Sequence, residues 1–97
     1  MFAIIIPTYN NLEYLKLCLH SIKKHSAFDH EIIIHVNEGV DGTLDFLKTK
    51  NFKTTYSKIN SGVCVAFNKA VSLATKKYIV LAHDDMYFCP NWDKVFV

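Results

Sequence analysis

Short runs of consecutive apolar, mostly β-branched residues alternate along the chain with longer segments in which apolar residues recur every three or four positions. The consecutive runs predict strands buried in a parallel sheet, and the periodic segments predict helices packed on that sheet. This alternation predicts right-handed β-α-β crossovers and an α/β fold with a mostly parallel sheet of about four strands. The predicted strands are 2–6, 31–36, 53–59 and 78–82, and the predicted helices are 12–24, 43–50 and 63–74.

Polar and turn-forming residues indicate where these elements begin and end. Pro7 follows the first apolar run and is expected to end that strand. Asn10 stands at the N-cap position of the first helix, and Glu13, three residues later, fits a capping box. The strand at 53–59 is the most polar and is expected near an edge of the sheet. The end of the chain suggests the start of a further helix, on Trp92, Val95 and Phe96.

Two adjacent acidic residues, Asp84 and Asp85, follow the last predicted strand. That strand has no polar positions and is expected to be buried on both faces. Adjacent carboxylates repel each other and are costly to desolvate, so a bound cation is the best explanation for the pair. Mg²⁺ or Mn²⁺ holding a phosphate on its far side is the usual arrangement. The alternative is that both acids start a turn or cap the next helix.

Three polar segments, 7–10, 37–39 and 83–85, follow predicted strands and should meet at one edge of the sheet. An aromatic ring and a hydroxyl group there could pack against a base, and an acid could accept a hydrogen bond from a base or ribose. The acid pair could hold a metal for a diphosphate. The chain has three glycines and neither of the common phosphate-loop patterns, which favours a metal over a backbone phosphate cradle.

Composition narrows the class of protein. The 97 residues make one domain, 1–97, and 51% of them are apolar, which is typical of a globular protein. The net charge of +2 comes from scattered residues and gives no indication of nucleic-acid binding. Cys18, Cys64 and Cys89 have no C-x-x-C spacing and are interpreted as reduced core residues of a cytoplasmic protein. No segment is apolar for long enough to span a membrane, and peripheral association through a partner is left open.

Four motifs follow one another along the chain: I-I-I-P-T-Y-N at 4–10, E-I-I-I at 31–34 continuing into N-E-G at 37–39 and D-G-T at 41–43, N-S-G at 60–62 with Ala66 and Asn68, and H-D-D at 83–85. In order and spacing they resemble the amino-terminal half of family 2 glycosyltransferases, which are inverting enzymes of the GT-A fold. The resemblance covers essentially the whole chain and implies a Rossmann-like three-layer sandwich, truncated after the donor-binding part.

The resemblance also implies roles for the polar residues at the sheet edge. Pro7, Thr8 and Tyr9 would line the pocket for uridine or another nucleoside. Glu38 stands where the family has the acid that reaches the base, and Asn37 stands at the acid before it. The family pattern has changed here, so the identity of the base does not follow.

The same resemblance assigns the diphosphate end of the site. Asn60 would contribute to nucleotide binding, and Asp84 would approach the ribose or sugar. Asp85, together with Asp84, would bind Mn²⁺ or Mg²⁺ bridging the diphosphate, so that charge on the leaving nucleotide is stabilised. Phe67 stands where the family commonly has an arginine. Lys69 either supplies that charge or lies solvated on the outer face of its helix.

The implied ligands are a nucleotide-diphosphate sugar, with a UDP-sugar favoured, and a saccharide or lipid-linked acceptor. The general base that deprotonates the acceptor is expected beyond Val97, so no catalytic residue is assigned. Asp93 is too close in sequence to the acid pair for that role, and Trp92-Asp93 is interpreted as local packing and a helix cap.

Two alternatives remain open: a non-catalytic nucleotide-binding or protein-interaction module of the same fold, and a nucleotidyltransferase with a related sheet. The latter class usually has a basic, glycine-rich loop after its first strand, which residues 7–11 lack. A sheet truncated in this way would leave an apolar edge uncovered near 86–97, which predicts a homo-oligomer formed through that region.

Overall fold

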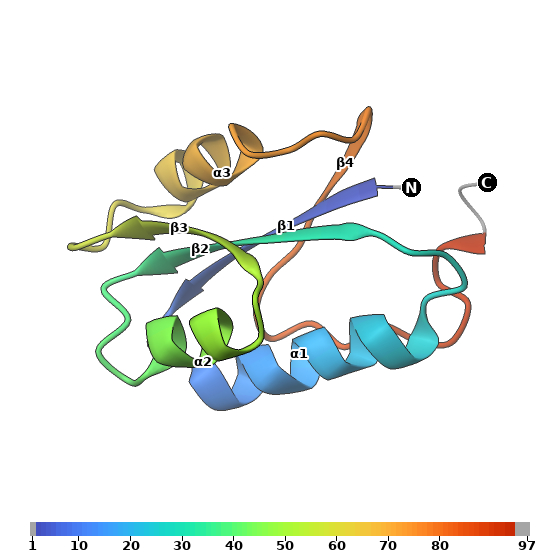
Figure 1. Cartoon of the computed structure of the whole chain (residues 1–97), viewed down its shortest axis with the longest axis horizontal. Helices are drawn as coiled ribbons and strands as arrows, with labels where there is room; N and C mark the ends of the chain where they lie inside the picture. The colour runs from blue at the N-terminus through green and yellow to red at the C-terminus, as the bar shows by residue number, and fades with distance from the viewer. Residues whose placement is uncertain (1, 95–97) are drawn as a thin grey trace.

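The computed structural model describes residues 2–94, and its strands and helices alternate along the chain (Figure 1). All four strands are parallel, in the spatial order β3-β2-β1-β4, so the predicted α/β class and four-stranded sheet are confirmed. The elements are β1 (Phe2–Tyr9), α1 (Leu12–His25), β2 (Glu31–Asn37), α2 (Thr43–Thr49), β3 (Lys53–Ser57), α3 (Val63–Val71) and β4 (Tyr78–Leu81).

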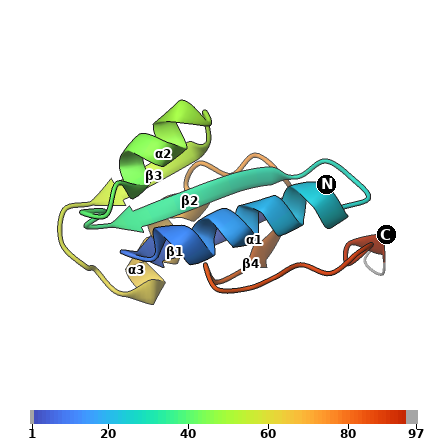
Figure 2. The same ribbon diagram turned by 90° about the horizontal axis from the view of Figure 1, so that it is seen from below.

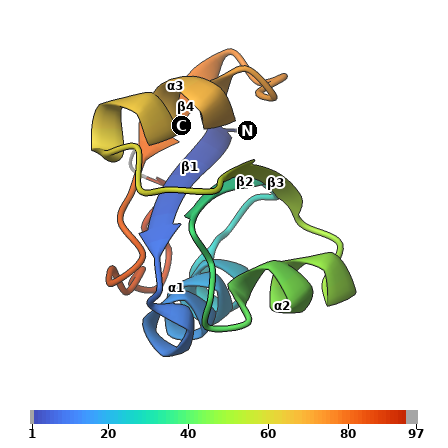
Figure 3. The ribbon, with the colours of Figure 1, turned by 90° about the vertical axis from the view of Figure 1, so that its left-hand side faces the viewer.

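The sheet lies between two layers of helices, with α1 and α2 on one face and α3 on the other (Figures 1 and 3). Alternate residues of β1 enter the two cores because successive side chains of a strand point to opposite faces. Ile4 and Ile6 pack in a cluster with Leu15 of α1. Ala3 and Ile5 pack with Ala70 of α3. The order of layers is therefore helix, sheet, helix.

β1 is a central strand that continues through Pro7 to Tyr9, so the prediction that Pro7 ends it is wrong. Backbone groups of successive residues in a strand point to alternate sides. The carbonyl of Ile5 faces β4, where it accepts a hydrogen bond from the N–H of Ala82 at 2.9 Å. Pro7 faces the same side, beyond the point where β4 ends at Leu81. The missing N–H of proline therefore costs no hydrogen bond between strands.

β4 is an edge strand, and the prediction that it is buried on both faces is wrong. Tyr78, Ile79 and Leu81 are 60%, 42% and 55% exposed. β4 pairs with β1 on one side only, and no other strand of the described residues lies beside it. An apolar, β-branched run therefore did not distinguish a central strand from an edge strand. The prediction that the third strand, β3, lies at an edge is confirmed.

The predicted capping box on Asn10 and Glu13 is wrong, because α1 starts at Leu12 and its cap comes from a distant loop. The backbone N–H of Leu12 donates a hydrogen bond to Asp41 Oδ2 at 3.0 Å. Asp41 Oδ1 accepts hydrogen bonds from the backbone N–H, at 3.3 Å, and the hydroxyl of Thr43. One carboxylate therefore caps the first turns of both α1 and α2.

The three helices each bury one face against the sheet, as their periodicity predicts. In α3 the buried residues are Ala66 and Ala70, whereas Val63, expected on the apolar face, is exposed at the start of the helix. Cys18 is buried in α1, but Cys64 and Cys89 are exposed, so the interpretation of all three cysteines as core residues is wrong for two of them. Within residues 2–94, no helix is long and apolar enough to cross a membrane.

After β4, the chain runs back beside α1 towards the loop that precedes β2 (Figure 2). This segment contains turns and no α-helix up to residue 94, and Val95 and Phe96 of the predicted helix lie outside the described residues. Its contacts include a hydrogen bond from Trp92 Nε1 to Ser26 Oγ at 3.0 Å. Asp93 caps no helix. Its carboxylate instead accepts hydrogen bonds from the backbone N–H groups of Ala27 and Phe28, in the loop that precedes β2.

Candidate functional site

A pocket of about 290 Å³ opens at the carboxyl edge of the sheet, where the segments after β1, β2 and β4 meet. Parallel strands bring these polar segments to one edge, as the sequence predicts. The predicted residues that line the pocket are Pro7, Thr8, Tyr9, Asn37, Asn60 and Asp84. His83, of the predicted polar segment 83–85, also lines it, and the sequence did not predict the other three lining residues: Asn11, Gly62 and Val63.

A larger pocket, of about 480 Å³, lies near the start of β2, between α1 and α2. It shares no lining residue with the pocket at the carboxyl edge. Its walls combine apolar side chains such as Phe46 and Phe52 with three lysines, Lys16, Lys23 and Lys50. It contains neither the acid pair nor any other predicted site residue, so the smaller pocket is the candidate functional site.

Thr8 and Asp84 connect two of the segments that form this site. Thr8 is buried near the end of β1, and its hydroxyl donates a hydrogen bond to Asp84 Oδ2 at 2.8 Å. A hydroxyl group donates only one hydrogen, so this contact engages one oxygen of the carboxylate. The other oxygen of Asp84 is the one that a ligand or metal ion could take up.

Two predicted site residues, Glu38 and Asp85, do not line the pocket. Asp85 is exposed in the turn after β4. Glu38 follows β2 with a backbone φ of 61°, and its N–H donates to the carbonyl of Ser57 at 2.8 Å. Ligand contacts by these two side chains therefore remain predictions.

The acid pair gives this edge of the sheet a negative field. Burial, and after it the negative charges of Asp84 and Asp85, together raise the pKa of the nearby Cys18 thiol to about 12. No lysine is among the pocket-lining residues, all of which belong to the described part of the chain. A diphosphate would therefore meet carboxylates here unless a cation lay between them.

The side chains fit a hard divalent ion that is shared with a ligand. Among residues 2–94, no group of three or more His, Cys, Asp or Glu side chains is arranged to hold a metal. Asp84 and Asp85 are adjacent acids at this edge, where Glu38 also follows β2. Mg²⁺ commonly binds through one or two carboxylates together with water and substrate phosphates, which matches two acids beside an open pocket.

Behind the pocket, a chain of hydrogen bonds connects α3, β3 and β2. Lys69 Nζ donates to Ser57 Oγ at 3.0 Å, Ser57 Oγ lies 3.0 Å from His35 Nε2, and His35 Nδ1 lies 2.7 Å from Thr55 Oγ1. An ammonium group can only donate, so Ser57 Oγ accepts from Lys69, and the tautomer of His35 sets the direction of the two contacts of the ring. Lys69 is exposed and does not line the pocket, but its ammonium group bonds Ser57, so its role as a replacement for the family's arginine stays a prediction.

His35 is fully buried within this chain. Burial lowers its pKa, and the positive charge of Lys69 lowers it further, against an opposing contribution from Asn37. The lowered pKa favours the neutral form of the imidazole. A histidine inside an apolar strand gave no sign of this network in the sequence, because its partners lie 20 and 22 residues away.

Known proteins with similar sequences are glycosyltransferases. The family described as "Glycosyl transferase family 2" matches residues 3–97. The chain is 31% identical over 90 residues to TuaG, a teichuronic acid biosynthesis glycosyltransferase of Bacillus subtilis, and this match covers 88% of the chain and 36% of TuaG. It is 32% identical over 95 residues to the chondroitin synthase of Pasteurella multocida, a match that covers 94% of the chain and 10% of that protein.

Solved structures agree. TarS 1–349 of S. aureus in complex with UDP aligns with a TM-score of 0.85 at 25% identity, over 98% of this chain and 30% of that one. The mannosyltransferase PcManGT of Pyrobaculum calidifontis, in complex with GDP-Man and Mn²⁺, aligns with a TM-score of 0.79 at 21% identity, over 97% of this chain and 30% of that one. At 21% identity, the likeness to PcManGT is evidence for the fold alone. The predicted GT-A architecture is confirmed.

The chain spans about a third of the length of TuaG and a smaller share of the chondroitin synthase. The family match nevertheless extends over residues 3–97, and the relatives are named as glycosyltransferases. The resemblance carried by the four motifs is thereby confirmed, and the chain belongs to glycosyl transferase family 2 and is a transferase by that membership.

Proposed function

We propose that the pocket at the carboxyl edge binds the nucleoside diphosphate part of a sugar donor, from which the whole protein transfers the sugar to an acceptor hydroxyl with inversion. The observation that carries this proposal is the meeting of Thr8 and Asp84 in one pocket, beside the aromatic ring of Tyr9. An aromatic and polar surface suits a nucleoside, and an acid pair suits a metal-bound diphosphate.

The spacing of the strands supports this orientation. Asn37 ends β2 and Asp84 follows β4, and these strands lie on opposite sides of β1. Two strand spacings amount to about 10 Å, which is long enough to place a nucleoside between these residues. The uncharged end, at Asn37 and Asn60, would take the base, and the acidic end would take the diphosphate. Pro7, Thr8 and Tyr9 would lie between them, with Glu38 reaching the nucleoside after a change of rotamer.

Asp84 and Asp85 would hold Mn²⁺ or Mg²⁺ in this arrangement. The hydrogen bond from Thr8 orients the Asp84 carboxylate and leaves one of its oxygens for the ion. When bound, such an ion offsets the negative charge of the diphosphate and of the nucleotide as it leaves. The Mn²⁺ present with GDP-Man in PcManGT supports a divalent metal at this type of fold.

The likeness to UDP-bound TarS favours a UDP-sugar as donor, and a saccharide or lipid-linked acceptor is proposed by family membership. The general base would lie in a part of the relatives' length that this chain does not cover. A cytoplasmic location, with peripheral attachment to a membrane, remains a proposal from the sequence. The second candidate function is a non-catalytic interaction module, which the exposed apolar residues of β4 favour.

Calorimetric titration of the protein with UDP, in Mn²⁺ and then in excess chelator, tests the donor site. We expect binding that needs the metal and that weakens about tenfold or more in Asp84→Asn and Asp85→Ala, since each change removes a charged ligand. Asp45→Asn, an exposed acid on α2, is the control and should bind as the unmodified protein does. Absence of nucleotide binding by the folded protein would favour the interaction module.

A further inference from the structure

The side-chain amide of Asn37 has a fixed orientation in the pocket. Asn37 ends β2 and is only 4% exposed. Its Oδ1 accepts a hydrogen bond from the backbone N–H of Ser61 at 3.2 Å and another from the Ser61 hydroxyl at 3.0 Å. A backbone N–H can only donate, so the oxygen of the amide must face Ser61. Nδ2 is the polar group of this amide that does not face Ser61, and the side chain, which lines the pocket, also has a hydrogen bond with His35.

The groups behind Asn37 keep the amide from turning over. The Ser61 hydroxyl lies 3.3 Å from Ser57 Oγ and 3.0 Å from Asn37 Oδ1, so its shorter contact is the one to Asn37. The backbone N–H of Ser61 donates to the same oxygen whichever acceptor the hydroxyl takes. Reversing the amide would bring Nδ2–H against the N–H of Ser61, and two facing donors in a buried site are strongly unfavourable. The pocket thus has a hydrogen-bond donor at this position.

The proposed function, on which this inference rests, indicates which part of the ligand meets this donor. The acids after β4 take the diphosphate, so the base lies at the far end of the pocket, over β2. Asn37 and Tyr9 are register partners on adjacent strands and both line the pocket. The base would then lie beside the ring of Tyr9, with its hydrogen-bonding edge towards Asn37.

We propose that Asn37 recognises the base as a donor, and that the site consequently has no preference for uracil over cytosine. Uracil can accept an Nδ2 hydrogen only at a carbonyl oxygen beside N3, and its N3–H finds no acceptor on Nδ2, whereas cytosine presents an unprotonated N3 that accepts the hydrogen directly. A carboxylate in the same position would accept the uracil N3–H and select against cytosine. UDP remains a ligand through its diphosphate and ring, and CDP binds at least as tightly.

The test is calorimetric titration of the protein with UDP and CDP in Mn²⁺, with the Asn37→Asp variant beside it. A carboxylate also accepts both hydrogen bonds from Ser61, so the variant keeps that anchor. We expect CDP to bind the unmodified protein at least as tightly as UDP. We expect the variant to shift the ratio of the two affinities towards UDP by about tenfold, as one charge-assisted hydrogen bond allows.

Ser61→Ala is the matched control, because it removes the hydroxyl but keeps the backbone N–H that orients Asn37. Its ratio of affinities should equal that of the unmodified protein. A tenfold preference of the unmodified protein for UDP, or an unchanged ratio in a folded Asn37→Asp variant, would overturn the assignment of Asn37. Failure of both nucleotides to bind the unmodified protein would instead overturn the proposed function, and this inference with it.

Discussion

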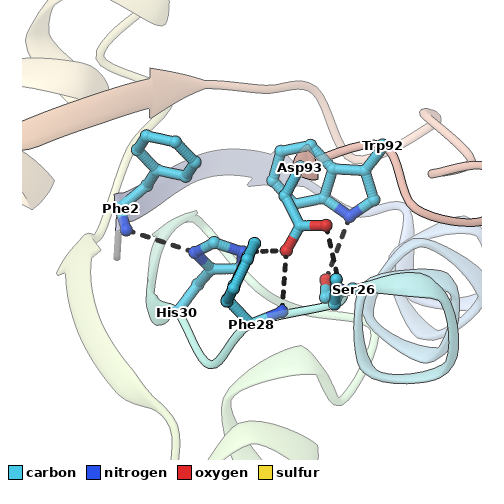
Figure 4. A network of polar contacts seen from close by, with 7 residues as sticks. Phe2, Ser26, Phe28, His30, Trp92 and Asp93 are labelled. Carbon is cyan, nitrogen blue, oxygen red and sulfur yellow. Dashed lines mark hydrogen bonds and ion pairs between the residues drawn. The ribbon is translucent and has the colours of Figure 1, made fainter. Parts of the chain in front are cut away.

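The carboxylate of Asp93 and the imidazole of His30 form a buried hydrogen bond, with 2.7 Å between Oδ2 and Nε2 (Figure 4). Asp93 also accepts hydrogen bonds from the backbone N–H groups of Ala27 and Phe28, both at 2.9 Å. On the other side of the ring, the N–H of Phe2 donates to His30 Nδ1 at 3.1 Å. The imidazole therefore donates its Nε2 hydrogen to Asp93. These contacts fasten the segment after β4 to the loop between α1 and β2.

Asp93 should make the stability of the fold depend on pH in the acid range. Burial alone would raise its pKa, but the hydrogen bonds from Ala27, His30 and Phe28 outweigh burial and lower the pKa from 3.8 to about 2. A carboxylate with a lower pKa in the folded state stabilises the fold above the pKa of the unfolded chain. That contribution is present above about pH 4 and is lost as the pH falls towards 2.

Asp93→Asn tests this contribution. The new amide group must face at least one N–H donor, so we expect the free energy of unfolding at pH 7 to fall by about 2 kcal/mol. Urea denaturation at pH 7 and at successively lower pH would also show a smaller loss of stability towards pH 2 than in the unmodified protein. Asp45→Asn provides the exposed control. An Asp93 variant as stable as this control at pH 7 would show that the carboxylate does not hold the segment.

Asp41→Ala should weaken two helix starts with one substitution. The carboxylate caps α1 through the N–H of Leu12 and α2 through Thr43. Burial raises its pKa, but the hydrogen bonds from Thr43 and Leu12 outweigh this and lower it, so Asp41 is ionised at neutral pH. Loss of a cap typically costs about 1 kcal/mol, so we expect a loss of about 2 kcal/mol in thermal or urea unfolding.

Asp45→Ala, in the first turn of α2, is the comparison for this cap, because it removes an acid near the same helix start without the bond to α1. Equal stability of the Asp41 and Asp45 variants would contradict the shared cap. In the Asp41 variant, the loop before α1 and the loop before α2 should still be held together in part. Asn10 Oδ1 accepts a hydrogen bond from the N–H of Val40 at 3.1 Å, and this bond does not involve Asp41.

The contacts of Asp41 and Asp93 explain why the sequence predicted the helices and strands better than the contacts between their connecting loops. The strand at β2 and the helices α1 and α2 followed from local periodicity, and the site followed from the rule that parallel strands bring polar segments to one edge. The capping box at Asn10 failed because the actual cap, Asp41, lies 29 residues beyond Leu12. Asp93 lies 63 residues from His30. A local pattern carries no information about partners at such separations.

Thr8→Val should separate binding from folding at the candidate site. Valine has nearly the same shape as threonine, and it removes the hydrogen bond that orients Asp84. We expect metal-dependent UDP affinity to fall about tenfold in calorimetric titration, with a loss of stability of only about 1 kcal/mol. Thr54→Val on β3 is the control, since its hydroxyl donates to the Phe52 carbonyl away from the pocket. Equal affinity of the Thr8 and Thr54 variants would remove Thr8 from the site.

The outer edge of β4 is the surface through which we expect two copies of the chain to associate. The sequence placed this surface around 86–97, but the contacts of Phe88, Trp92 and Asp93 show that much of that segment packs on the protein. The exposed large apolar side chains in this part of the chain are instead Tyr78, Ile79 and Leu81 of β4, and Met86 and Tyr87 after the acid pair. An edge strand with free backbone N–H and C=O groups and apolar side chains is prone to pair with another chain.

Sedimentation equilibrium at increasing protein concentration would detect this association, and Leu81→Lys should abolish it by placing a charge on the edge. Val40→Lys, at a residue that is 81% exposed in the loop before α2, adds the same charge far from β4 and should leave the association unchanged. A monomer at every concentration would contradict the prediction. Association that persists in Leu81→Lys would place the contact elsewhere, because a charge that becomes buried between two paired strands without a partner is strongly unfavourable.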